Sequence, residues 1–271
     1  MRRPLAVILA SFAVLVGDAR GDTGVLAIGD FGVGGEVERR TGAAMNRFAG
    51  GRPAHVLVTL GDNDYTERPR AFRRNWTASF GWARAQGLRV AGTLGNHDVR
   101  VNRGRYEFDL LGMPARYYRR RVEDIAFFLL DSTWINRAQT RWLARSLAAS
   151  TASWKIVAFY HPAFSCGVYR GDRRVRRRWV PLFERHDVDL VLSGHDHNYQ
   201  RFGPRRGVTY LVHGGGGARL YDLERCPAGF PRRVEARKVH GWLYVRADNE
   251  ALRVQAVGRR GRFLDRFRIY P

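Results

Sequence analysis

Residues 188–201 read VDLVLSGHDHNYQR, and they are the most informative part of the sequence about its fold. Its first six residues, Val188–Ser193, are mostly apolar and β-branched, which predicts a buried strand. The strand is followed at once by Gly-His-Asp-His at 194–197. A His-x-His loop on its own is often only structural. It carries more weight here because an apolar run followed by polar, metal-ligating side chains occurs at several other places in the chain.

Four more predicted strands end in the same way. In α/β folds, ligand sites gather at the carboxyl ends of strands, because the loops there share one rim. Any one of these strand ends could be an ordinary turn, but all of them in order are hard to obtain by chance. The strands and the residues that follow them are 24–28 with Asp30, 54–60 with Asp62 and Tyr65, 89–94 with Asn96, His97 and Asp98, and 154–160 with His161.

The rest of the chain alternates between strands and helices. Amphipathic stretches predict helices at 36–48 and 138–149, and Asp172 is expected to cap a helix that runs to about His186. Further strands are predicted at 125–130 and 208–213. Apolar and polar residues alternate from 241 to 269, as in antiparallel strands. The pattern indicates α/β layers with mixed sheets.

Together the strand ends supply two carboxylates, an amide oxygen, three imidazoles and a phenol. This set contains no thiolate and suits Fe, Mn or Zn. It exceeds the needs of one ion, and two ions that share a carboxylate fit it better. Such a pair can activate water and stabilise both the attacking and the leaving oxygen in a displacement.

The ordered set Asp, Gly-Asp, Gly-Asn-His, later His and Gly-His-x-His resembles the calcineurin-like metallophosphoesterase superfamily. The resemblance implies an α/β fold, a four-layer αββα sandwich with two mixed β-sheets. Tyr65, three residues after Asp62, gives Gly-Asp-x-x-Tyr, which resembles the purple acid phosphatase-like branch in its single-domain form. A loop tyrosine without a metal role is the alternative reading of Tyr65.

The resemblance also implies a role for each residue. One ferric ion and one divalent ion (Fe, Zn or Mn) are expected, with a metal-bound hydroxide as the attacking group. His97 is expected to face the substrate as a catalytic residue, with Asp98 orienting it. The implied ligands are Asp30, Tyr65 and His197 for the ferric ion, Asn96, His161 and His195 for the divalent ion, and Asp62 for both.

The sequence departs from the family after His161. Many members carry a second histidine within the next dozen residues, near the substrate, whereas residues 162–171 contain none. Tyr169 stands about where that histidine is expected. Tyr169 or Arg170 could contact phosphate instead, which leaves the general-acid assignment open.

The N-terminus has the pattern of an export signal. Two arginines precede an apolar run, and small residues precede a possible cleavage after Ala19. We expect a signal peptide at 1–19, a metallophosphoesterase domain at 20–271, and an exported protein, secreted or in the cell envelope, without a stable membrane anchor. A buried first strand or an uncleaved anchor is the alternative. Export permits a bridge between Cys166 and Cys226, but the sequence leaves it open.

The composition is strongly basic. Lys and Arg total 47 against 25 Asp and Glu, for a formal charge of +22, and all but Lys155 and Lys238 are arginines. Since the arginines are scattered from end to end, codon bias explains them better than nucleic-acid binding does. We therefore expect no specific nucleic acid, although the field favours anions.

The function expected from these features is a secreted, metal-dependent phosphoric ester hydrolase that resembles acid phosphatases and takes small anionic phosphate monoesters. A phosphodiesterase or nucleotidase on the same metals is the first alternative. A basic protein that binds envelope polymer or DNA, with an idle metal site, is the second. Specificity is expected in loops at 66–85 and 219–239, and the sequence does not give the oligomeric state.

Overall fold

The computed structural model describes residues 22–271, so the predicted signal peptide at 1–19 lies outside the described residues. Thirteen strands of the described part form two mixed sheets. The first sheet has the order β13-β12-β11-β1-β2-β3, with β1, β2 and β3 parallel and the others antiparallel. Its strands are β1 (Thr23–Ile28), β2 (Val56–Thr59), β3 (Arg89–Ala91), β11 (Gly241–Ala247), β12 (Leu252–Gly258) and β13 (Phe263–Ile269).

The second sheet has the order β10-β8-β9-β7-β6-β5-β4. Its central strands β5, β6, β7 and β9 are parallel, and antiparallel strands flank them. The strands are β4 (Tyr118–Val122), β5 (Ile125–Leu129), β6 (Trp154–Ala158), β7 (Leu190–Ser193), β8 (Tyr199–Arg205), β9 (Val208–His213) and β10 (Arg233–Arg237).

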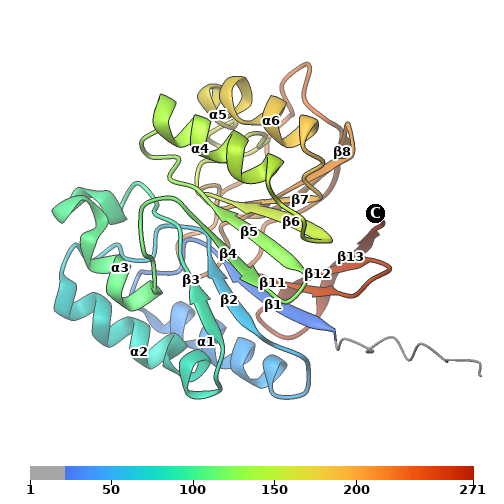
Figure 1. Ribbon diagram of the computed structural model, residues 1–271. Helices are drawn as coiled ribbons and strands as arrows, with labels where there is room; N and C mark the ends of the chain where they lie inside the picture. The colour runs from blue at the N-terminus through green and yellow to red at the C-terminus, as the bar shows by residue number, and fades with distance from the viewer. Residues whose placement is uncertain (1–21) are drawn as a thin grey trace, which may run out of the picture.

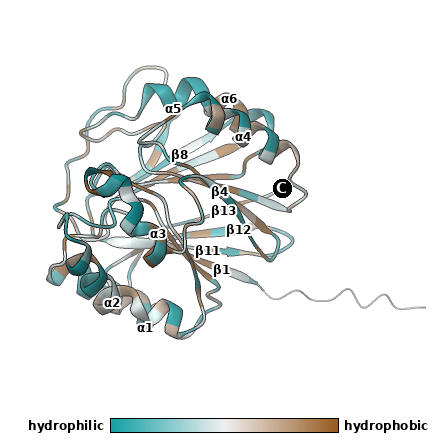
Figure 2. Ribbon diagram, turned by 60° about the vertical axis from the view of Figure 1, so that its left-hand side comes forward, coloured by the Kyte–Doolittle hydropathy of each residue, from teal (hydrophilic) through white to brown (hydrophobic). Residues whose placement is uncertain are grey.

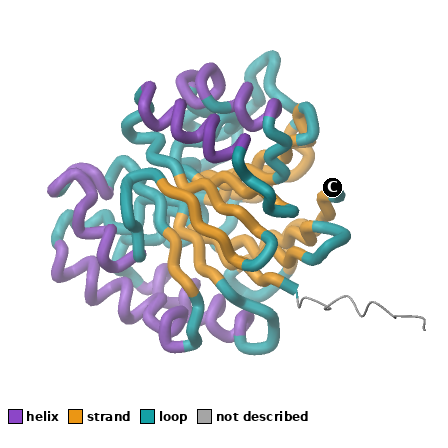
Figure 3. The backbone as a smooth tube through the Cα atoms, viewed as in Figure 1, coloured by secondary structure: helices purple, strands orange, loops and turns teal. Residues whose placement is uncertain are grey.

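Helices cover the outer faces of the two sheets (Figures 1 and 3). One layer lies against the first sheet and the other against the second, which confirms the predicted four-layer αββα sandwich with two mixed β-sheets. The first layer contains α1 (Glu36–Ala49), α2 (Pro69–Ala85) and α3 (Arg105–Leu111), and the second contains α4 (Arg137–Ala148), α5 (Arg173–Arg178) and α6 (Val180–Arg185). Two short 3-10 turns, η1 (Asp98–Arg100) and η2 (Asn102–Gly104), precede α3.

The burial of the central strands explains their composition. All residues of β1, β2, β5 and β7 are buried, because each of these strands is covered on both faces. Their near-continuous apolar runs therefore show no alternation. Hydrophobic colour concentrates on the strands between the helical layers, and hydrophilic colour is prominent on the helices (Figure 2).

Three predicted elements differ from the structure. The expected specificity loop at 219–239 contains the strand β10 near its end. The expected specificity loop at 66–85 is mostly the helix α2, whose Phe72, Trp76 and Phe80 are buried. The single helix expected from Asp172 to His186 is two helices. Asp172 caps the first one through Arg174 N and Val175 N, as predicted. The break comes at Trp179 because Pro181 lacks an N–H and its ring opposes the preceding turn.

Candidate metal centre

The loops after β1, β2, β3, β6 and β7 meet at one edge of the two sheets. Backbone contacts tie them together: Asp30 N donates to Gly61 O (3.0 Å), and Gly194 N donates to Tyr160 O (3.1 Å). His195 N donates to Asp30 Oδ2 (2.8 Å). The predicted convergence of these distant segments is therefore present in the structure.

Asp30, Tyr65 and His197 form a triangle of donor atoms. Asp30 Oδ1 lies 3.3 Å from Tyr65 Oη and 3.2 Å from His197 Nε2, and Tyr65 Oη lies 3.2 Å from His197 Nε2. Ligand bonds of about 2.0–2.2 Å separate neighbouring ligands of an octahedral ion by about 3 Å. The triangle is therefore close in size to one face of such a coordination shell.

The orientation of His197 suits this role. Its Nδ1 lies 2.7 Å from the carbonyl oxygen of Arg219, which can only accept a hydrogen bond. The Nδ1 proton is thereby fixed, and Nε2 is the nitrogen that faces Asp30 and Tyr65 and could bind a metal once it is deprotonated. The ring of Tyr221 stacks on His197 with 4.0 Å between centroids, which holds the imidazole plane.

The second group of predicted ligands is more open. The rings of His161 and His195 lie 4.7 Å apart between centroids, and both side chains are half-buried. Ser132 Oγ lies 3.0 Å from His161 Nδ1, so Nε2 is the nitrogen left for the site. Asn96 is also half-buried. The residues on either side of it are fixed through their backbones, since Gly95 N donates to Asp98 and His97 N donates to Asp62.

Asp62 lies between the two groups. Its Oδ1 accepts a hydrogen bond from His97 N (2.8 Å), and its Oδ2 accepts one from the hydroxyl of Tyr160. Tyr160 also donates to Asp30 Oδ1 (3.1 Å). The hydroxyl of Tyr160 thus links the two carboxylates.

The backbone at three of the predicted ligands is strained. Asp30, Asp62 and His195 have φ of 57°, 49° and 74°, a region that residues with a Cβ rarely occupy. The neighbouring glycines allow the loops to approach, since a Cβ on Gly95 would collide with Asp62, and one on Gly194 would lie 2.6 Å from Asp30 Oδ2. Strain that clusters on the candidate ligands points to a functional constraint.

The electrostatics of these groups suit a bound cation. Burial raises the pKa of Asp30, and burial together with the charge of Asp30 raises the pKa of Asp62 to about 6. Burial and the two carboxylates also raise the pKa of the Tyr65 phenol. A cation among these groups would stabilise all three anions. The donor set therefore fits one hard cation beside Asp30 and a second ion on the imidazole side of Asp62.

The side-chain geometry does not by itself identify a metal site. Within residues 22–271, no group of three or more His, Cys, Asp or Glu side chains is placed to hold a metal by itself. The triangle contains only two such residues, because its third vertex is a phenol. The ligand roles of the seven residues remain predictions that rest on the donor set and the distances.

The structure contradicts the predicted role of Asp98, whereas the role of His97 stays a prediction. Asp98 does not orient His97; its carboxylate instead accepts hydrogen bonds from Asn63 N, Asn63 Nδ2, Asp64 N and Gly95 N at 2.7–3.0 Å. His97 Nδ1 finds no hydrogen-bond partner among residues 22–271. A carboxylate that accepts four bonds cannot also turn toward the imidazole, so Asp98 fastens two loops together. His97 Nε2 lies 4.0 Å from Asp62 Oδ2, at the edge of the site.

Sequence reasoning left the residue at the missing-histidine position open between Tyr169 and Arg170. The ring of Tyr169 stacks on His195 with 4.0 Å between centroids. Arg170 instead lies 3.1 Å from Glu224. Tyr169 therefore occupies the site side of this loop, and Arg170 points to another loop.

Other site residues were missed. Tyr160 directly precedes His161, and Ser132 follows the strand β5 by three residues, but neither belongs to a recognised motif. The bridge that the sequence left open is present: Cys166 and Cys226 form a disulfide that closes the loop after His161 onto the segment after β9.

Comparison with known proteins identifies the family of the chain. The family model of the calcineurin-like phosphoesterases matches residues 23–199. Tartrate-resistant acid phosphatase type 5 of Rattus norvegicus is 23% identical over 252 residues, covering 78% of this chain and 77% of that protein. Purple acid phosphatase 4 of Arabidopsis thaliana is 29% identical over 79 residues, covering 29% and 23%.

Solved structures show the shared fold. Purple acid phosphatase PPD1 from yellow lupin superposes with a TM-score of 0.80 at 16% identity, covering 92% of this chain and 54% of that one. GAP50, the anchor in the inner membrane complex of Plasmodium, gives 0.72 at 17% identity, covering 92% and 89%. The chain belongs to the calcineurin-like phosphoesterase family of binuclear, metal-dependent phosphoric ester hydrolases, and its relatives are purple acid phosphatases.

Proposed function

We propose that this protein is an exported phosphatase that hydrolyses phosphate monoesters at a centre of one ferric and one divalent ion (Fe, Zn or Mn). The observation that carries the proposal is the triangle of Asp30, Tyr65 and His197 beside Asp62. A phenol aimed at a carboxylate and an imidazole suits a hard trivalent ion, because such a charge lowers the pKa of the phenol. In this assignment Asn96, His161 and His195 hold the divalent ion and Asp62 contacts both ions.

When bound, the two ions supply Lewis acidity and a more acidic water. The protein's own groups do the remaining work. His97 is a quarter exposed and its backbone N–H is fixed by Asp62, so its ring stands at the edge of the site where a leaving group departs. Burial lowers the pKa of His97, which makes its proton easier to give to a leaving oxygen. Tyr169, half exposed over His195, is placed to contact the phosphate oxygens.

Export is supported by two features. The first is the apolar, positively charged start of the sequence, and the second is the Cys166–Cys226 disulfide, which persists in oxidising compartments. None of the helices in residues 22–271 has both the length and the apolar character required to cross a bilayer. We propose a location outside the cytoplasm, secreted or in the envelope.

Phosphate release tests the proposed function. The purified protein, loaded with iron and zinc, is expected to release phosphate from monoesters faster than from diesters. Asp62→Asn is expected to lower kcat/KM about 10³-fold or more, because metal contacts stabilise transition-state charge by several kcal/mol. Asn tolerates the positive φ at this position, and its amide oxygen still accepts from His97 N, so the fold is retained.

Arg73→Gln is a matched control, since Arg73 is exposed on α2 and is not part of any loop that carries a predicted ligand. Faster cleavage of diesters would favour the phosphodiesterase alternative. If phosphate is not released from any ester and DNA is bound with a steep salt dependence, the basic binding protein is the better description.

A further inference from the structure

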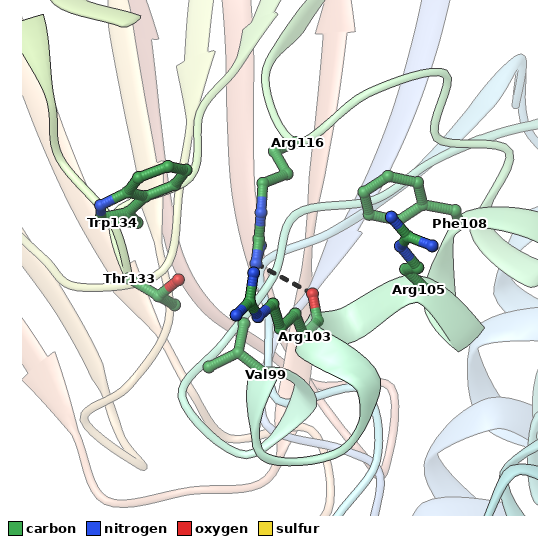
Figure 4. A pocket seen from close by; sticks show the side chains of 7 residues that line it. All are labelled: Val99, Arg103, Arg105, Phe108, Arg116, Thr133 and Trp134. Carbon is green, nitrogen blue, oxygen red and sulfur yellow. Dashed lines mark hydrogen bonds between the residues drawn. The ribbon is translucent and has the colours of Figure 1, made fainter.

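The largest cavity described lies outside the metal centre. Its volume is about 650 Å³, within the range of small-molecule sites. Figure 4 shows Trp134 and Thr133 on one side of it and Phe108 and Arg105 on the other, with two further arginine side chains between them. The cavity, which we call the arginine–tryptophan pocket, is lined by Val99, Arg103, Arg105, Phe108, Arg116, Thr133 and Trp134.

The pocket adjoins the centre on the side of His97 and His161. Val99 stands two residues after His97 in the same loop. Thr133 directly follows Ser132, whose hydroxyl lies 3.0 Å from His161 Nδ1. A substrate whose phosphate lies among the predicted ligands can therefore extend its leaving group past His97 into this pocket.

The pocket carries free positive charge. Arg116 already has partners, since its guanidinium lies 3.1 Å from Asp131 and donates to the Arg103 carbonyl (2.9 Å). Arg103 and Arg105 are exposed and form no ion pair within residues 22–271. Two unpaired guanidiniums at one cavity are suited to a phosphate, which accepts charge-assisted hydrogen bonds.

The pocket also carries an unused aromatic surface. Trp134 is 63% exposed, so most of its indole surface at the pocket is open to a ligand. An indole face beside cations stacks a planar base, and such stacking tolerates any base. Sugar or lipid phosphates supply no aromatic ring for this surface.

We propose that the arginine–tryptophan pocket binds the leaving group of a nucleoside polyphosphate, with the base on Trp134 and the inner phosphate between Arg103 and Arg105. The inference rests on the proposed function and names its substrate class. With ADP, water oxygen bonds to the terminal phosphorus, the bond from that phosphorus to the bridging oxygen breaks, and AMP leaves with the electron pair. The water proton passes to solvent or, by way of His97, to the products. AMP and phosphate are formed, and nothing is oxidised or reduced.

Three substrates separate the features of the pocket. ADP has an aromatic base and a charged leaving group, 4-nitrophenyl phosphate has only the ring, and glycerol phosphate has neither. Arg103→Gln with Arg105→Gln is expected to lower kcat/KM about tenfold for ADP and less than twofold for the other two. Trp134→Ala is expected to lower kcat/KM about tenfold for ADP and not for glycerol phosphate. Arg73→Gln, which removes an exposed arginine elsewhere, is expected to change none of the three.

A binding measurement separates this inference from the proposed function. AMP is titrated into the metal-loaded protein by calorimetry, with inorganic phosphate in excess to occupy the centre. AMP affinity is expected to fall about tenfold in the double arginine variant and to be unchanged in Arg73→Gln. If no ester is hydrolysed but this difference is found, the phosphatase proposal fails and the pocket stands. If all three substrates are hydrolysed and the pocket variants change neither the ADP preference nor AMP binding, the pocket proposal is overturned.

Discussion

The two halves of the candidate centre differ in how much of their geometry exists before any ion is bound. On one side, Asp30 and His197 are buried, and with Tyr65 they place three donor atoms within 3.3 Å of one another. On the other side, Asn96, His161 and His195 are half-buried, and the two imidazoles touch through their ring faces and edges. In the first half the donor atoms contact one another directly. In the second half, neighbouring side chains that pack against the ligands hold them in place.

This difference has a physical consequence for metal binding. A site whose donors are already in place loses little conformational entropy when it binds, so it holds its ion more tightly. The open half is also the more accessible one, since its three ligands are half-buried whereas Asp30 and His197 are buried. We therefore expect a retained ion at Asp30–Tyr65–His197 and an exchangeable one at Asn96–His161–His195.

Metal removal gives the largest expected effect. Mild chelation is expected to lower phosphatase activity at least 10³-fold while one ion per chain remains bound, because the open half empties first. Added Zn²⁺, Mn²⁺ or Fe²⁺ is expected to restore activity without added ferric iron. Metal analysis gives the number of ions bound per chain, and the phosphatase assay on the same samples gives the activity. Simultaneous loss of the two ions would contradict the distinction between the halves.

Removal of the disulfide is expected to lower the stability of the protein and to weaken the open half more than the closed half. Cys166 and Cys226 are 60 residues apart, and their bridge restricts the unfolded chain by about 4 kcal/mol in the chain-entropy account. Cys166→Ser with Cys226→Ser is therefore expected to lower the free energy of unfolding by about 2–4 kcal/mol, measured by urea denaturation.

The same variant tests which half depends on the loop. Cys166 lies in the loop that carries Tyr169 onto His195, so divalent affinity is expected to weaken. Any visible absorption of the iron-loaded protein is expected to be unchanged. A shift of that absorption would show that the loop supports both halves.

Tyr65→Phe sharpens the comparison from the other side. The iron-loaded protein is expected to be purple or pink through a phenolate–ferric bond, and this variant is expected to be colourless. Activity is expected to fall tenfold at most, since the phenol has no contact with the open half. Tyr160→Phe is the matched control: it removes the other hydroxyl that bonds Asp30, and the colour is expected to remain. If Tyr160→Phe removes the colour and Tyr65→Phe does not, the assignment of the two tyrosines is reversed.

The motifs at the strand ends carried most of the prediction. Apolar strands followed by Asp30, Asp62, Asn96, His161 and His195 were recognisable because fully buried strands have no polar interruptions and ligands come directly after them. The helix α2 was not recognised, because four arginines between Arg68 and Arg74 obscure the positions of Phe72, Trp76 and Phe80 that pack on the core.

Contacts between distant loops could not be predicted from spacing. Asp98 was expected to act on its neighbour His97, whereas in the fold the carboxylate points to the loop of Asn63. Tyr160 reads as the last apolar residue of a strand, and only the packing of the two sheets brings its hydroxyl to both carboxylates. The arginine–tryptophan pocket combines residues from three segments and leaves no local signature.

Titration of the imidazoles compares the two halves in the unmodified protein. It is the test with the smallest expected effect. Burial and the neighbouring imidazoles lower the pKa of His195 to about 3. Burial also lowers the pKa of His197, but its hydrogen bond to Asp30 and the charge of that carboxylate more than offset this, and the pKa lies above 6.5. In metal-free protein, NMR titration is expected to show His197 protonated at a pH where His195 is neutral.

The two shifts have opposite signs for stability. Because the pKa of His195 is lowered in the folded protein, the unfolded chain takes up the proton first as pH falls. The contribution of His195 to the free energy of unfolding is therefore present above pH 6.5 and is lost as pH falls toward 3. The raised pKa of His197 contributes to the free energy of unfolding below pH 6.5. This contribution is lost as pH rises through the folded pKa of His197. An ion at the closed half must displace the His197 proton, so its uptake is expected to slow as pH falls through the raised folded pKa of His197, while uptake at the open half is limited less by His195. Equal pH dependence at both halves would show that the carboxylate of Asp30 does not distinguish them.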